Sequence, residues 1–253
     1  MPMTKLMGIH AVQEALTSGL PLDRVIVAHG RRGQRIEEIV ALARRRGIPV
    51  RFESRDQLDR FAEGAHHQGV VALAAAKAML DLADLIARAR RPGLVVLLEG
   101  VEDPRNLGAI VRTALAAGAD GLVIPERRAV GLTETVAQTS AGALAHLPVA
   151  RIKNLARAME ELKTAGYWLV GLDERAERSH TAIDFTAPIA LVLGGEGQGL
   201  HELTRKQCDW LVSIPTVGPV RSLNVSVAAG IVLFEVVRQR AAKSAAAPAK
   251  PSA

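Results

Sequence analysis

From residue 93 onward, short apolar runs alternate with longer amphipathic segments. The run GLVVLLEG at 93–100 is almost continuously apolar, which is typical of a strand that is buried on both faces of a sheet. A regular alternation of such strands with helices predicts an α/β fold, with a mostly parallel sheet and helices on both of its faces. The other strand-like runs are DGLVIP, YWLVGLD, PIALVLG and WLVSIP, and the helix-like segments are GAIVRTALAAGA, NLARAMEELKTAG, LHELTRKQC and residues 225–240.

Residues 1–75 predict a separate, smaller α/β domain. GIHAVQEALTSG has a helical pattern that ends at Gly19, and QRIEEIVALARRRG is an amphipathic segment with a basic last turn, which suits the helix dipole. RVIVA, IPVRFE and GVVALAA are strand-like. We expect residues 76–92 to form a short helix and a linker, residues 93–240 to form the second domain, and the low-complexity tail 241–253 to be disordered.

The charge balance favours a polyanionic partner. The chain of 253 residues has a formal net charge of +6, and most of its 32 basic residues are arginines. Because the planar guanidinium group binds phosphate well, this bias favours nucleic acid, although a genome rich in arginine codons would give the same bias. Aromatic residues make up only 3% of the chain, so the core must be aliphatic and stacking platforms of Phe and Tyr are not expected.

Several kinds of site and location are excluded or disfavoured. Cys208 is the single cysteine, so no intramolecular disulfide can form, and we expect this residue to be a small core residue. His66 and His67 stand beside no acidic cluster and are expected in a solvated loop, with an RNA contact as the alternative. No apolar run approaches the ~18 residues of a membrane span, and the N-terminus lacks the apolar stretch of a signal peptide. We therefore expect a cytoplasmic protein.

Polar side chains follow the strand-like runs, and in open α/β sheets ligands bind at the carboxyl ends of strands. The first cluster, EGVEDPRNLGAIVRTA at 99–114, has Asn106 near a helix start and Arg112 within an otherwise apolar helix. Arg112 could instead be held in a structural ion pair. The second cluster, LVLGGEGQGL, has glycines on both sides of Glu196, and glycine allows a backbone to approach a ligand closely.

The third cluster precedes the helix predicted from Val225 onward. Arg221, Ser222 and Asn224 are three hydrogen-bonding side chains in four positions. Ser and Asn commonly cap a helix by accepting hydrogen bonds from its first free N–H groups, but one residue is enough for a cap. The other two side chains therefore need a different explanation, such as a ligand.

Familiar catalytic and phosphate-binding motifs are absent from the sequence. GGEGQGL departs from G-x-G-x-x-G because Leu200 stands at the last required glycine, and no G-x-x-x-x-G-K-[ST] occurs. His201 and Glu202 do not begin an H-E-x-x-H motif, because Arg205 stands at the second histidine position. No Ser-His-Asp set can be assigned.

In order and spacing, NLGAIVRTALAAG, LVLGGEGQGL and IPTVGPVRSLNVSVAAGIVLFE closely resemble the three motifs of the SpoU-type (TrmH-like) RNA ribose 2'-O-methyltransferases. The resemblance covers about residues 93–240. Residues 1–75 resemble the substrate-binding domain, similar to ribosomal protein L30e, that precedes it in many members. VEDPRNLGAIVRTA and NLARAMEEL are most similar to bacterial members that methylate a guanosine in the peptidyl-transferase centre of 23S rRNA. The alternatives are a tRNA ribose as acceptor, or a non-catalytic RNA-binding factor of ribosome assembly.

The resemblance implies S-adenosylmethionine as cofactor, a deep trefoil knot in the second domain, a homodimer, RNA as partner and no need for a metal. It also implies a set of site residues. The catalytic residues would be Asn106, Arg112, Glu196, Ser222 and Asn224, and the cofactor-binding residues Gly194, Ile214 and Leu223. The sequence departs from the common pattern at Thr216 and Val217, where Met and Ala are usual.

The resemblance assigns Arg112 to activation of the 2'-hydroxyl. An arginine is a poor general base because its pKa exceeds ~12. We therefore expect Arg112 to act as a cation that lowers the pKa of the hydroxyl and holds a neighbouring phosphate. Asn106 and Ser222 can position the ribose, and Glu196 and Asn224 can hold Arg112 and the loop backbones.

Overall fold

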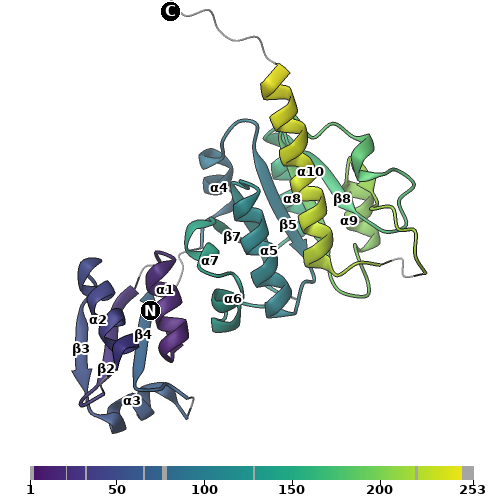
Figure 1. Ribbon diagram of the computed structural model, residues 1–253. Helices are drawn as coiled ribbons and strands as arrows, with labels where there is room; N and C mark the ends of the chain where they lie inside the picture. Colours follow the sequence, from purple (N-terminus) through teal and green to yellow (C-terminus); the bar gives the residue numbers. More distant parts are fainter. Residues whose placement is uncertain are drawn as a thin grey trace, which may run out of the picture. The chain divides into compact units, whose positions relative to one another are not determined.

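The computed structural model describes residues 3–20, 22–31, 33–64, 66–75, 79–127, 129–219 and 222–246 (Figure 1). Arg32, Arg221 and residues 247–253, which enter the sequence predictions, lie outside the described residues. The chain divides into two compact units: Met1–Ala78 with Leu132–His146, and Met79–Gly131 with Leu147–Ala253.

The first unit has a four-stranded sheet in the order β1-β4-β2-β3. Strand β4 pairs antiparallel with β1 and β2, while β2 and β3 are parallel. The strands are β1 (Met3–Met7), β2 (Leu22–Ala28), β3 (Val50–Glu53) and β4 (Val70–Ala75). The helices are α1 (Ile9–Thr17), α2 (Gln34–Arg45), α3 (Arg55–Ala62), α6 (Glu134–Thr139) and α7 (Ala143–His146).

Three features of this unit differ from the sequence pattern. Helix α3 is not predicted by apolar periodicity, but a capping box in which Ser54 and Gln57 bond each other's backbone starts it. Residues 132–146 group with the first unit because α6 packs against β1, whereas the pattern predicts one continuous domain over 93–240. The prediction of a solvated His67 is wrong: the ring is buried, and its Nε2 lies 2.8 Å from the carboxylate of Asp59.

The second unit confirms the predicted parallel sheet. Its six strands lie in the order β10-β8-β9-β5-β6-β7, and every neighbouring pair is parallel. The strands are β5 (Leu94–Glu99), β6 (Gly121–Pro125), β7 (Val149–Ile152), β8 (Trp168–Leu172), β9 (Ile189–Gly194) and β10 (Trp210–Val212). The helices are α4 (Leu82–Arg88), α5 (Pro104–Ala116), α8 (Leu155–Thr164), α9 (Glu202–Gln207) and α10 (Val225–Ala246), with a short 3-10 helix at His180–Ala182.

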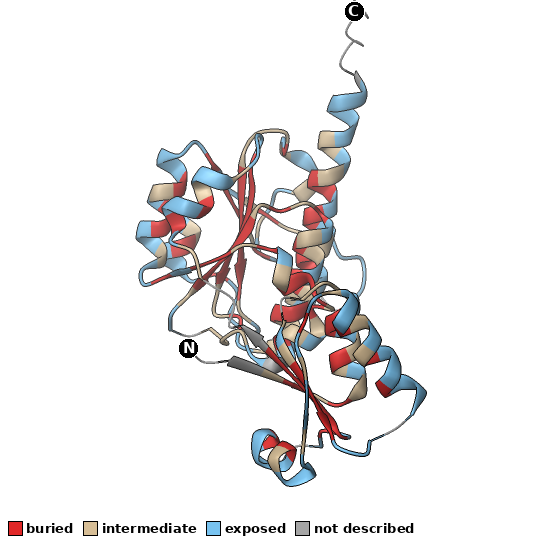
Figure 2. Cartoon of the chain, turned by 90° about the vertical axis from the view of Figure 1, so that its left-hand side faces the viewer, coloured by how far each residue is buried: buried red, intermediate tan, exposed pale blue. Residues whose placement is uncertain are grey.

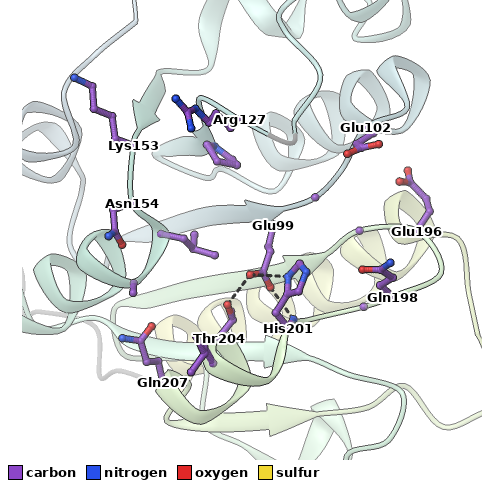
Figure 3. A pocket seen from close by; sticks show the side chains of 17 residues that line it. Glu99, Glu102, Arg127, Lys153, Asn154, Glu196, Gln198, His201, Thr204 and Gln207 are labelled. Carbon is purple, nitrogen blue, oxygen red and sulfur yellow. Dashed lines mark hydrogen bonds and ion pairs between the residues drawn. The ribbon is translucent and has the colours of Figure 1, made fainter.

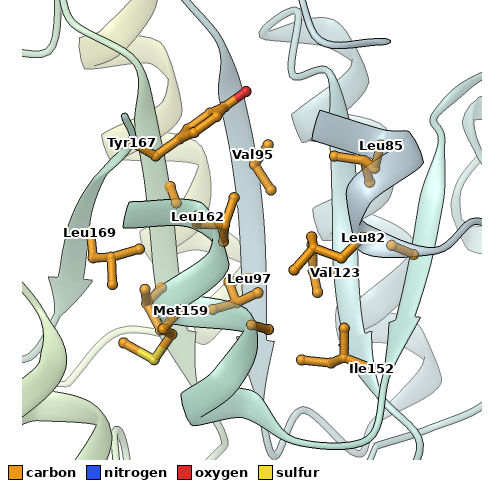
Figure 4. Packing of buried hydrophobic residues seen from close by; sticks show 14 of the residues in the cluster. Leu82, Leu85, Val95, Leu97, Val123, Ile152, Met159, Leu162, Tyr167 and Leu169 are labelled. Atoms are coloured by element: carbon orange, nitrogen blue, oxygen red, sulfur yellow. The ribbon is translucent and has the colours of Figure 1, made fainter. Parts of the chain in front are cut away.

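The central strands are buried on both faces, as their continuous apolar runs predict (Figure 2). On one face Val95 and Leu97 of β5 pack against Leu85 of α4 and Met159 and Leu162 of α8 (Figure 4). Alternate residues of the same strands point to the other face, which α5 and α10 cover. The sheet therefore lies between two helical layers, and its carboxyl edge carries the loops that contain the polar clusters.

Helix α10 packs along α5 and extends past residue 240 to Ala246, six residues into the predicted tail. The guanidinium of Arg240 donates hydrogen bonds of 2.9–3.1 Å to the carbonyls of Phe185, Pro92, Gly93 and Ala187. These contacts hold the last turns of α10 against the segments that precede β5 and β9, so the helix continues past residue 240. Within the described ranges, no helix is long and apolar enough to span a membrane.

Candidate active site

The three polar clusters follow three strands of one parallel sheet, so they lie at its carboxyl edge. Strands β5 and β9 are neighbours, and Glu99 pairs with Gly194 in their register. Strand β10 lies further away, beyond β8. Residues 222–224 of the third cluster nevertheless lie beside the cluster at 99–114, because the chain after β10 leads into α10, and α10 packs on α5.

Hydrogen bonds connect all three clusters. Asn106, in the first turn of α5, donates from Nδ2 to Glu196 Oε1 over 2.6 Å. Asn224, just before α10, donates from Nδ2 to Asn106 Oδ1 over 3.0 Å. The three residues are far apart in sequence, so this contact exists only in the folded chain.

Asn224 is also the cap of α10. Its Oδ1 accepts hydrogen bonds from the Ser226 backbone N–H at 2.9 Å and from the Ser226 hydroxyl at 2.6 Å. Because a backbone N–H can only donate, Oδ1 must face it, and the Asn224 amide NH₂ must then face Asn106. The helix cap thus orients the whole chain of hydrogen bonds down to Glu196.

A cavity of about 500 Å³, here called the Gly194 cavity, lies beside these hydrogen bonds. Six of the predicted residues line it: Gly194, Glu196, Ile214, Ser222, Leu223 and Asn224. Ser222 is exposed and makes no hydrogen bond within the described residues, so its hydroxyl is available to a ligand.

The glycines are required by close backbone contacts. A Cβ on Gly194 would lie 2.1 Å from the carbonyl carbon of Gly199, and a Cβ on Gly195 would lie 2.1 Å from the carbonyl oxygen of Gly100. No real side chain tolerates such distances to backbone atoms. The loop of residues 195–199 can therefore fold back onto the end of β9 and form a wall of the cavity.

Glu99, which the sequence motifs do not single out, binds the segment that follows this loop (Figure 3). Its side chain is only 12% exposed and lies 3.0 Å from His201 Nδ1. It also accepts hydrogen bonds from the His201 backbone N–H at 3.0 Å and from the Thr204 hydroxyl at 2.7 Å. The available sequence signal is a carboxylate at the end of an apolar strand, but the residues that Glu99 contacts lie more than 100 positions away in the sequence.

A second unpredicted carboxylate, Asp173, borders the Gly194 cavity at the end of β8. Its Oδ2 lies 3.0 Å from Arg175 Nη2 and 2.6 Å from Arg205 Nε. Burial by itself would raise the pKa of Asp173, but the hydrogen bonds from Arg175 and the charge of Arg205 outweigh it and lower the pKa. Asp173 is therefore ionised at neutral pH and already paired.

Arg112 contacts neither the Asn224–Asn106–Glu196 hydrogen bonds nor the carboxylates of Glu99 and Asp173 among the described residues. It is exposed on α5, and within the described residues it makes no ion pair or hydrogen bond. The structural ion pair considered above is thus not found there. The expected contact with Glu196 is not observed either, because the carboxylate of Glu196 bonds to Asn106 instead.

No group of three or more His, Cys, Asp or Glu side chains in the described part of the chain is arranged to hold a metal ion.

Comparison with known proteins points in one direction. The sequence matches the SpoU rRNA Methylase family over residues 93–234. It also matches a family described as RNA 2'-O ribose methyltransferase substrate binding over residues 5–80. It is 44% identical over 238 residues to YacO of Bacillus subtilis (strain 168), named as a TrmH family tRNA/rRNA methyltransferase; the match covers 93% of this chain and 95% of YacO.

Two solved structures are similar over most of their length. The SpoU methyltransferase AviRb from Streptomyces viridochromogenes, in complex with AdoMet, is 30% identical with a TM-score of 0.74, covering 94% of this chain and 90% of AviRb. The AdoMet-bound rRNA methyltransferase from Sinorhizobium meliloti is 27% identical with a TM-score of 0.73, covering 93% and 87%.

Proposed function

Because the chain belongs to the SpoU family of RNA methyltransferases, which use S-adenosylmethionine, we propose that it methylates a ribose 2'-hydroxyl of RNA, and specifically a guanosine in the peptidyl-transferase centre of 23S rRNA. The observation that carries this proposal is the chain of hydrogen bonds from Asn224 through Asn106 to Glu196 beside the Gly194 cavity. It joins the three family motifs at one place.

The Gly194 cavity suits the cofactor. Its volume lies within the roughly 300–1,000 Å³ typical of small-molecule sites. Gly194 leaves no room for a side chain against the loop, and Ile214 and Leu223 offer apolar contact and backbone groups. In this proposal these three residues hold S-adenosylmethionine, which supplies an electrophilic methyl group when bound.

The acceptor hydroxyl needs help from the protein, because a ribose 2'-hydroxyl is a weak nucleophile at neutral pH. The Ser222 hydroxyl, which has no hydrogen-bond partner among the described residues, can bond the ribose. Glu196 uses one carboxylate oxygen for Asn106 and can offer the other to the acceptor. Arg112, free of any carboxylate in the described part of the chain, can hold an RNA phosphate and stabilise the developing alkoxide.

Substitutions of Arg112 test this mechanism. Lysine keeps the charge but not the two-pronged guanidinium geometry, so Arg112→Lys and Arg112→Ala should each lower the single-turnover methylation rate by about 10²-fold or more. The affinity for S-adenosylmethionine and the melting temperature should change little. Arg105 is exposed on the same helix, and Arg105→Lys is the matched control. A near-native rate for Arg112→Lys would refute the catalytic role.

The RNA target is tested by mapping 2'-O-methyl groups on total RNA from cells with and without the gene. Loss at one guanosine of 23S rRNA supports the proposal. YacO is named as a tRNA/rRNA methyltransferase, so a tRNA ribose is the second candidate, and loss confined to tRNA would favour it. An unchanged methylation pattern would favour a non-catalytic role in ribosome assembly.

We further propose a homodimer. Val227, Ile231 and Phe234 recur at helical spacing on α10 and are 52%, 37% and 51% exposed, so they form an apolar stripe that a second copy can cover. Light scattering tests this: a particle of 26.9 kDa at micromolar concentration would contradict it.

The finer architecture is also proposed from family membership. Two features support the trefoil knot in residues 93–240. Strand β9 lies between β8 and β5, and the C-terminal helix α10 packs against α5, near the start of the domain. An L30e-like RNA-binding role for residues 1–75 is supported by the substrate-binding family match. A cytoplasmic location follows from the proposed work on ribosomal RNA.

A further inference from the structure

A second and larger cavity opens at the same edge of the sheet. It has a volume of about 850 Å³ and is here called the Arg127 cavity (Figure 3). The loop around Glu196 separates it from the Gly194 cavity, because Gly195, Glu196, Gln198 and Gly199 line both. A ligand in the Arg127 cavity would therefore lie next to the proposed methylation site.

Two cations in the Arg127 cavity have no anionic partner among the described residues. Arg127 and Lys153 follow strands β6 and β7, and no carboxylate in the described ranges pairs with either. Figure 3 shows both on one side of the cavity, opposite Glu99 and His201.

None of the three carboxylates that line the cavity pairs with Arg127 or Lys153 in the described part of the chain. Glu99 is already bonded to His201 and Thr204, and Glu196 is bonded to Asn106. Glu102 is exposed and makes no ion pair in the described part of the chain. Its side chain lies on the side of Glu196, away from Lys153 (Figure 3). The side that carries Arg127 and Lys153 therefore suits an anion.

The same cavity has an apolar wall. Pro125 and Leu155 line it, and so does Leu203, whose side chain is 77% exposed although it is large and apolar. A nucleotide combines an anionic phosphate with a flat base whose faces are apolar, so it matches both parts of the lining.

We propose that the Arg127 cavity binds the RNA nucleotide adjacent to the methylated ribose. Its phosphate lies between Arg127 and Lys153, and its base packs against Pro125 and Leu203. The inference rests on the proposed function, since it takes the substrate to be RNA. Binding in this cavity adds a second contact between the protein and the RNA strand, and this contact holds the acceptor ribose next to Glu196.

The test uses the full-length protein and an unmethylated transcript of 23S rRNA. Arg127→Ala/Lys153→Ala should raise the Kd for this RNA by about 10-fold or more and flatten the dependence of log K on log salt by about 0.7, as expected for the loss of one phosphate contact to a single strand. The Kd for S-adenosylmethionine should stay within twofold. Leu203→Glu, on the apolar wall, should also raise the RNA Kd while the cations remain.

A charge-matched control separates a specific site from general attraction. Arg88 and Lys243 are exposed residues outside the cavity, so Arg88→Ala/Lys243→Ala removes the same two charge types. Equal loss of RNA affinity in both double variants, or none in Arg127→Ala/Lys153→Ala, would overturn the proposal. If the wild-type protein binds the transcript but methylates no RNA, the proposed function fails, while the binding comparison still decides the cavity.

Discussion

Gly194→Ala should disable the proposed cofactor site through one added methyl group. The new Cβ would lie 2.1 Å from the carbonyl carbon of Gly199, 2.4 Å from its oxygen and 2.5 Å from the backbone nitrogen of Leu200, whereas ordinary contact begins at 3.4 Å. All three atoms belong to the backbone, so no side chain can rotate away. The 195–199 loop must shift by about 1 Å or more, as cores do when overpacked.

The size of the effect follows from this displacement. Overpacking of this kind costs about 1–3 kcal/mol, and the shifting segment is itself a wall of the Gly194 cavity. If that cost falls on binding, the Kd for S-adenosylmethionine rises about 5- to 150-fold. Titration calorimetry measures the Kd, and a melting curve establishes that the variant is folded.

Gly218→Ala is the matched control, because a Cβ at Gly218 meets no atom within 4 Å among the described residues. It should bind S-adenosylmethionine like the wild type. Our account of the glycine loop is wrong if Gly194→Ala is folded and binds the cofactor within twofold of the wild-type Kd.

Two further predictions concern stability and reactivity. Arg240→Met should lower the free energy of unfolding by about 2–4 kcal/mol, because it leaves the partly buried carbonyls of Phe185 and Ala187 without their donor. Arg157→Met, which breaks only an exposed pair with Glu161, should cost about 1 kcal/mol or less; equal effects in urea denaturation would contradict this. Burial raises the pKa of Cys208 to about 12, so iodoacetamide at pH 8 should alkylate it roughly a thousandfold more slowly than an ordinary thiol. Rapid labelling of the folded protein would refute this burial.

Much of the second unit could be predicted from local sequence. Continuous apolar runs identify β5 and β9, and the 3.6-residue period identifies α5 and α10, because these signals depend only on neighbouring residues. Elements with few apolar residues were missed. Helix α3 buries only Leu58 and Ala62. Strand β7 has four residues, with Arg151 exposed between buried neighbours.

The sequence by itself determined the parallel α/β class, the glycine loop and the polar positions of the three motifs. Each of these features depends on residues that are close together in the sequence, within one helical turn, one strand or one loop. The tertiary structure alone decided how those positions meet. Asn106 forms hydrogen bonds with Glu196, 90 residues away, and with Asn224, 118 residues away. Glu99 accepts a hydrogen bond from the backbone of His201, more than 100 residues away. Such contacts depend on the strand order β8-β9-β5 and the packing of α10 on α5. Local periodicity predicts neither the strand order nor the helix packing, because it indicates which face of an element is buried and not which element covers that face.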